Sequence, residues 1–156
     1  MQETPHIRVL LVDDHQHIHD IVTELLNAAE DIDLVGQVHS GHDAVALCRI
    51  VKPDLVLMDV IMPVMSGAET TRVLLEECPD LRVLVMSSFR EYERIKEMLD
   101  SGALGYLVKD AIAEDLLNTI RAVYQGNMVF SPEVAETVLF RSSTEHTSDF
   151  GLTERE

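Results

Sequence analysis

The sequence has few cysteines, few basic residues and no long apolar run, and each shortage excludes a class of protein. No apolar stretch approaches the roughly 20 residues that span a bilayer, and the first residues lack the basic-then-apolar layout of a signal peptide. The two cysteines, Cys48 and Cys78, form no Cys-x-x-Cys pair, so we expect buried free thiols in a reducing cytoplasm.

Acidic residues outnumber basic residues in this chain. The chain has 12 Lys and Arg against 28 Asp and Glu among 156 residues, a net charge of −16. Such a chain repels the phosphates of nucleic acid, so we do not expect this segment to bind DNA itself. Its length suits one ordinary domain with a small appendage.

Four short apolar runs each end on polar residues that could take part in chemistry. Ile7–Val12 is followed by Asp13 and Asp14, Leu55–Met58 by Asp59, Leu81–Met86 by Ser87 and Ser88, and Leu104–Val108 by Lys109. If the runs are neighbouring parallel strands, their carboxyl ends bring three carboxylates, a hydroxyl and an ammonium group together. Such a crevice could bind a divalent cation and hold a phosphoryl group.

Helical patterns alternate with these runs. Apolar residues recur at helical spacing over 18–29, 44–51, 74–78, 95–99 and 112–124, and a weaker strand, Leu34–Val38, is expected at a sheet edge. Ser40 is placed to cap one helix, and Ser66 with Glu69 forms a capping box for the next. Five βα units in about 120 residues predict a parallel sheet covered by helices on both faces.

The C-terminal residues differ in character from this alternation. Ser131-Pro132-Glu133 predicts the start of a short helix, and residues 142–149 are polar and resemble a linker. Thr153 and Glu156 form a second capping box with no helix after it. We therefore expect a domain over 6–127, a linker with a short helix over 128–150, and the start of a truncated second domain at 151–156.

These motifs, in this order, resemble the receiver domain of bacterial two-component response regulators. The resemblance covers about residues 6 to 127. It rests on Asp13-Asp14, Asp59, Ser87, Tyr106 and Lys109, on the stretch Met58–Pro63 with Gly67, and on Gly102–Asp110, which is similar to the NarL/FixJ class. Leu152–Glu156 resembles the opening of a LuxR-type helix-turn-helix domain. The implied fold is α/β and flavodoxin-like, with a five-stranded parallel sheet in the order 2-1-3-4-5.

The resemblance implies a role for each residue of the crevice. Asp59 would accept a phosphoryl group from a sensor histidine kinase, and Lys109 and Ser87 would contact its oxygens. Mg²⁺ would be held by Asp13, Asp14, Asp59 and the backbone carbonyl of Ile61. Ser87 and Tyr106 would act as the switch, with Tyr106 moving inward. The output would be homodimerisation and control of transcription by the missing DNA-binding domain, in the cytoplasm of a bacterium.

Physical chemistry supports these roles. Three carboxylates within a few ångström repel one another, so at least one pKa should rise unless a cation lies among them. A carboxylate can form an acyl phosphate, and phosphorylation adds about −1.5 to −2 of charge with strong acceptor oxygens.

The chain departs from the usual receiver pattern at three places. Asp110 follows Lys109 where most receivers have a cis proline, which leaves the isomer of that peptide bond open. Ser87 replaces threonine and keeps the hydroxyl. Ile61 and Phe89 occupy positions that are often polar in fast-dephosphorylating members, so we predict a long-lived phosphoryl group.

Other interpretations of the same residues remain. Asp and Ser at strand ends are often only helix caps, and an aromatic residue such as Tyr106 on an edge strand is often plain packing. His15 and His19 share a helix face and could suggest a transition-metal site, but no third ligand lies nearby in sequence.

Three alternative functions would each require other sequence features. An Asp-nucleophile phosphatase-like hydrolase would want Asp-x-Asp after the first strand and a cap over a substrate pocket. A flavodoxin-like cofactor binder would want a glycine-rich phosphate loop there. A non-phosphorylatable interaction module would not need the complete set of site residues. We expect a signalling domain rather than a classical enzyme.

Overall fold

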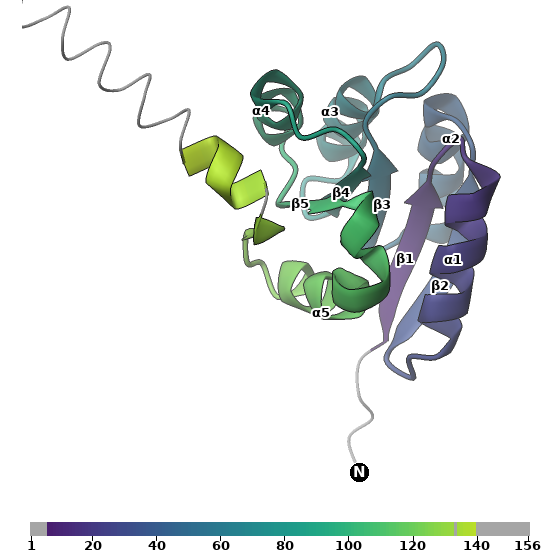
Figure 1. Ribbon diagram of the computed structural model, residues 1–156. Coiled ribbons are helices and arrows are strands. Elements are labelled where there is room, and N and C mark those ends of the chain that lie inside the picture. Colours follow the sequence, from purple (N-terminus) through teal and green to yellow (C-terminus); the bar gives the residue numbers. More distant parts are fainter. Residues whose placement is uncertain (1–5, 133, 140–156) are drawn as a thin grey trace, which may run out of the picture.

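The computed structural model describes residues 6–132 and 134–139 of the chain (Figure 1). The polar part of the predicted linker, residues 142–149, and the predicted domain start at 151–156 lie outside these residues. Within the described part of the chain, no helix combines the length and the apolar character that crossing a membrane requires.

Strands and helices alternate along the chain as the apolar runs predict. The strands are β1 (Ile7–Val12), β2 (Ile32–Val38), β3 (Leu55–Asp59), β4 (Arg82–Ser87), β5 (Gly105–Val108) and β6 (Val129–Phe130). The helices are α1 (Gln16–Asn27), α2 (Gly41–Val51), α3 (Gly67–Glu77), α4 (Tyr92–Asp100), the 3-10 turn η1 (Lys109–Ala111) and α5 (Ile112–Tyr124). Residues 132 and 134–139 are also helical, which agrees with the predicted short helix in the linker.

The sheet is parallel and its strands lie in the order β2-β1-β3-β4-β5-β6. The first five strands follow the expected order, and β2 lies at an edge as predicted. The sixth strand was missed, because two residues are too short for an apolar pattern to be recognised. Its presence corrects a second expectation: β5, which carries Tyr106, is an interior strand rather than an edge strand.

Helices cover both faces of the sheet, which is why the central strands are apolar throughout (Figure 1). One core cluster combines α1 and α5 with strand residues such as Leu11, Leu57 and Leu84. The other combines α2, α3 and α4 with strand residues that include Met58 and Tyr106. The strands between the two layers are held from both sides, which fixes the positions of the residues at their carboxyl ends.

Local signals set the helix ends. Ser40 and Ser66 cap α2 and α3 by accepting the backbone N–H groups of Asp43 and Glu69, at 3.2 and 3.1 Å. Gly102 and Gly126, which follow α4 and α5, have φ of 111° and 93°, a conformation that glycine adopts without strain.

Candidate functional site

The residues that follow β1, β3 and β5 meet at one rim of the sheet, in what we call the acidic crevice: Asp13, Asp14, His15, Asp59 and Lys109. Asp13 and Asp14 directly follow β1, Asp59 ends β3, and Lys109 follows β5. Asp13 is fully buried, Asp59 is 4% exposed and the Lys109 side chain is 11% exposed. The carboxyl ends of parallel strands thus bring together the carboxylates and the lysine, as the sequence predicts.

Lys109 neutralises part of the crevice. Its Nζ lies 2.9 Å from Asp13 Oδ2 and 3.3 Å from Asp59 Oδ1. Asp59 Oδ1 also accepts the backbone N–H of Val60 at 2.9 Å. One ammonium group therefore faces two buried carboxylates, and a third carboxylate, Asp14, lies beside them.

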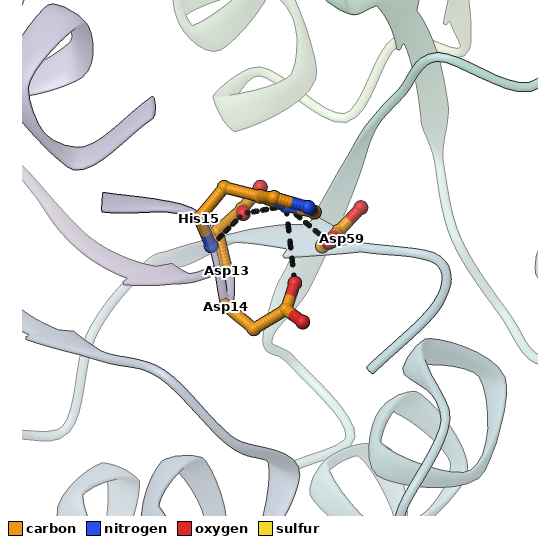
Figure 2. Close-up of side chains that lie close together, drawn as sticks. All are labelled: Asp13, Asp14, His15 and Asp59. Atoms are coloured by element: carbon orange, nitrogen blue, oxygen red, sulfur yellow. Dashed lines mark hydrogen bonds and ion pairs between the residues drawn. The ribbon is translucent and has the colours of Figure 1, made fainter. Parts of the chain in front are cut away.

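His15 lies among all three carboxylates, an arrangement that Figure 2 shows. Its Nδ1 is 3.1 Å from Asp13 Oδ1, 3.1 Å from Asp14 Oδ1 and 3.7 Å from Asp59 Oδ2. Ligand atoms of these four residues lie within 4.8 Å of one another. The ring occupies a position where a cation would balance the charge, and its side chain is 51% exposed, so it can rotate outward.

Three carboxylate oxygens in the crevice are buried and have no hydrogen-bond partner: Asp13 Oδ2, Asp14 Oδ1 and Asp59 Oδ2. Lys109 and His15 lie within ion-pair distance of these oxygens but form no hydrogen bond of suitable geometry with them. A buried carboxylate oxygen without a donor is costly, so the set is suited to a ligand that supplies positive charge. Carboxylate oxygens of this kind are ligands for a hard divalent cation.

The pKa of Asp59 is raised from 3.8 to about 6. Burial of the carboxylate is the largest cause, and the charge of Asp13 adds to it, while Lys109 opposes both. The expected rise of a pKa among three close carboxylates thus falls on the residue expected to accept the phosphoryl group.

A cavity of about 360 Å³ opens above the crevice and is lined by Asp14, His15, Asp59, Ile61, Ser88, Phe89 and Lys109. Ile61 is 39% exposed at its rim. Ile61 and Phe89 thus border Asp59, as expected from their positions. The Lys109–Asp110 peptide bond, whose isomer the sequence left open, is trans.

Ser87 and Tyr106 lie beside the crevice rather than in the cavity. Ser87 is buried at the end of β4, and its hydroxyl oxygen accepts the backbone N–H of Phe89 at 3.0 Å. Tyr106 is fully buried, and its hydroxyl donates to the carbonyl oxygen of Phe89 at 2.8 Å. Burial raises the pKa of Tyr106, with a hydrogen bond to Ser87 acting in the opposite direction. The aromatic ring therefore already points inward in this structure.

Close backbone packing holds the Asp59 strand end in place. A Cβ on Gly67 would lie 2.0 Å from the carbonyl oxygen of Asp59, so only glycine lets α3 approach this closely. The backbone N–H of Gly67 donates to the carbonyl oxygen of Val60 at 2.8 Å. Gly67 thus couples the start of α3 to the strand end that carries Asp59.

The histidines after Asp14 separate rather than cluster. His19 is buried, and its Nε2 donates to the backbone carbonyl oxygen of Asp13 at 2.7 Å. His15 turns to the carboxylates instead, so these two histidines do not form a metal site together. Sequence reasoning missed His15 as a member of the acidic crevice, although its position directly after Asp14 was a signal that could have identified it.

The expectation that both cysteines are buried needs one correction. Both cysteines are free, and Cys48 is buried, but Cys78 is exposed. Cys78 follows α3 as its C-terminal cap, where the chain turns towards solvent, so its place in the apolar pattern of α3 was misleading.

Known proteins resemble this chain in sequence and in fold. The response regulator receiver domain family matches residues 9–121. The response regulator GacA of Pseudomonas aeruginosa is 39% identical over 153 residues, and VraR of Staphylococcus epidermidis is 37% identical over 150; each alignment covers 96% of this chain and 72% of the relative. A LuxR-family two-component response regulator from Aurantimonas superposes with a TM-score of 0.84 at 25% identity, covering 88% of this chain and 99% of that one.

Proposed function

The chain belongs to the response regulator receiver family of two-component systems, and we propose that it is switched by phosphorylation of Asp59. Members of this family are signalling proteins rather than classical enzymes. The observation that carries the proposal is the acidic crevice, where a buried Asp59 with a raised pKa lies 3.3 Å from Lys109 Nζ and both residues line an open cavity.

The acidic crevice fits a divalent cation. Asp13, Asp14 and Asp59 would hold Mg²⁺, together with the backbone carbonyl of Ile61. The three buried carboxylate oxygens that accept no hydrogen bond support this assignment. When bound, Mg²⁺ would neutralise charge on the phosphoryl oxygens. His15 would rotate towards solvent, since its Nδ1 occupies the space between the carboxylates.

The chain's own residues would carry the phosphoryl transfer from a phosphohistidine of a sensor kinase. An oxygen of the ionised Asp59 attacks the phosphorus, and the bond from phosphorus to the histidine nitrogen of the kinase breaks. Lys109 pairs with the phosphoryl oxygens as negative charge gathers on them. The displaced imidazole nitrogen leaves with the electron pair of the broken bond and takes up a proton from solvent.

The switch would act through Ser87 and Tyr106. A phosphoryl oxygen on Asp59 would draw the Ser87 hydroxyl away from the N–H of Phe89, which it accepts at 3.0 Å. The inward, buried position of Tyr106 would then be favoured further, because the Tyr106 hydroxyl donates to the carbonyl oxygen of Phe89, the residue whose N–H the Ser87 hydroxyl accepts. The proposed output is homodimerisation and control of a C-terminal DNA-binding domain, which would take place in the cytoplasm.

One experiment tests the proposal. The chain is incubated with Mg²⁺ and acetyl phosphate, and its intact mass is measured. We expect a gain of one phosphate that is lost in Asp59→Asn and kept in Asp80→Asn, a matched control because Asp80 is exposed in the loop before β4. Absence of any gain with Mg²⁺ present, or an equal gain in Asp59→Asn, would overturn it.

The phosphoryl group should be long-lived. Ile61 and Phe89 line the cavity beside Asp59 and offer no polar side-chain group to orient a hydrolytic water. We expect the double variant Ile61→Asn/Phe89→Glu to lose phosphate faster than the wild type, as followed by intact mass after removal of acetyl phosphate. Equal decay rates in the two proteins would contradict this explanation.

A further inference from the structure

The two cysteines come together on the face of the sheet that α2 and α3 cover. Cys48 lies on α2 and Cys78 directly follows α3, and Cys78 is near enough to Cys48 to add to the effect of burial in raising the pKa of the Cys48 thiol. The neighbouring residues fix this approach: Arg49 and Glu77 form a two-bond ion pair, with Nε 3.1 Å from Oε2 and a second contact from Nη2 to Oε1. The backbone N–H of Cys78 donates to the carbonyl oxygen of Leu74 at 2.8 Å, which holds the cap in place.

The two thiols differ sharply in access. Cys48 is 2% exposed and packs in the core cluster with Ala44 and Leu74. Cys78 is exposed and borders a surface hollow that is also lined by Pro53 and Asp80. Burial raises the pKa of Cys48 to about 11, so this thiol stays protonated in the folded protein. A soluble oxidant therefore reaches Cys78 first.

We propose that Cys48 and Cys78 form an oxidation site that closes to a reversible intramolecular disulfide. With a peroxide as oxidant, the Cys78 thiolate attacks one oxygen, the O–O bond breaks, and a sulfenic acid and water form. The Cys48 sulfur then attacks the Cys78 sulfur, the S–O bond breaks, and the hydroxide leaves as water with the Cys48 proton. Two thiols are oxidised by two electrons in all, and one peroxide is reduced to two waters. A dithiol reverses the bond by exchange.

This site is separate from the acidic crevice. Helices that connect parallel strands run back along the sheet, so the ends of α2 and α3 lie at the rim opposite the carboxyl ends of the strands. The disulfide would tie α2 to α3 without touching Asp59, and phosphate uptake from acetyl phosphate should be the same before and after oxidation.

Peptide mapping of the peroxide-treated, Mg²⁺-free protein tests the proposal. We expect trypsin to release residues 9–49 and 73–82 as one cross-linked species, lighter than the two separate peptides by two hydrogen atoms and separated again by dithiothreitol. Cys78→Ser should remain reduced. Cys48→Ala should gain oxygen on Cys78 without a cross-link within the chain. If wild-type Cys78 gains oxygen just as it does in Cys48→Ala, or pairs only with a second chain, the proposal is wrong.

Discussion

Asp59→Asn should stabilise the metal-free protein at neutral pH, although it should abolish phosphate uptake. Asp59 is 4% exposed and shares one lysine with Asp13, so its ionised form is disfavoured in the folded state. Asparagine has nearly the same shape and carries no charge at any pH. The substitution therefore removes an unfavourable charge and leaves Lys109 paired with Asp13 at 2.9 Å.

The magnitude follows from the pKa of Asp59, which rises from 3.8 to about 6 on folding. A pKa raised by folding means that the folded state binds the proton more tightly. The stabilisation of the folded state by protonated Asp59 is fully present below pH 3.8 and is lost as the pH rises through about 6. A pKa difference of one unit between the folded and unfolded states corresponds to about 1.4 kcal/mol, so ionised Asp59 lowers the free energy of unfolding by up to about 3 kcal/mol above pH 7.

Chemical denaturation in EDTA at pH 8 and at pH 4 measures this cost. The free energy of unfolding of Asp59→Asn should exceed that of the wild type by up to about 3 kcal/mol at pH 8 and by less than about 1 kcal/mol at pH 4. Asp80→Asn should show no comparable change between the two pH values. A variant that is less stable than the wild type at pH 8, or a gain that is equal at both pH values, would refute the reasoning.

Three further substitutions test the crevice and its surroundings. His15→Ala should bind Mg²⁺ more tightly than the wild type in a calorimetric titration, because the Nδ1 that lies 3.1 Å from two carboxylates no longer has to move; weaker binding would mean that His15 is itself a ligand. Val64→Gly should raise the free energy of unfolding by about 1 kcal/mol in urea, because Val64 is 91% exposed with φ of 69°, a conformation costly for a β-branched side chain; Val64→Ala, which keeps a Cβ, should gain less. Ser131→Ala should lower it by about 1–3 kcal/mol, because the buried N–H of Val108 donates to Ser131 Oγ at 3.0 Å, and an unchanged midpoint would contradict that role.

Much of the fold could be predicted because its signals are local and repeated. Strands such as β3 are buried over their whole length, so their apolar runs stand out from the amphipathic helices between them. Ser40 and Ser66 mark helix starts by chemistry that acts within three residues. β6 could not be predicted, because its two residues gain their place only from pairing with β5.

The positions of single side chains depend on packing that the sequence does not display. The exposure of Cys78 depends on where α3 stops, one residue before it. The position of His15 depends on the distance between the ends of β1 and β3, which no periodicity records. The inward side chain of Tyr106 depends on the carbonyl of Phe89, 17 residues earlier in the chain.

The acidic crevice is better explained by binding than by helix capping, and the cap assignments decide between the two. If the strand-end residues were only caps, their side chains would accept the first N–H groups of the following helices. Ser66 caps α3 in place of Asp59, and the N-cap residues that precede α1 and α4, His15 and Glu91, make no side-chain cap bond. Asp59 instead carries a charge that costs up to about 3 kcal/mol out of a typical domain stability of about 5–15 kcal/mol. A buried charge with a cost of that size, beside carboxylate oxygens that accept no hydrogen bond and an open cavity, is expected of a site that a bound ligand stabilises.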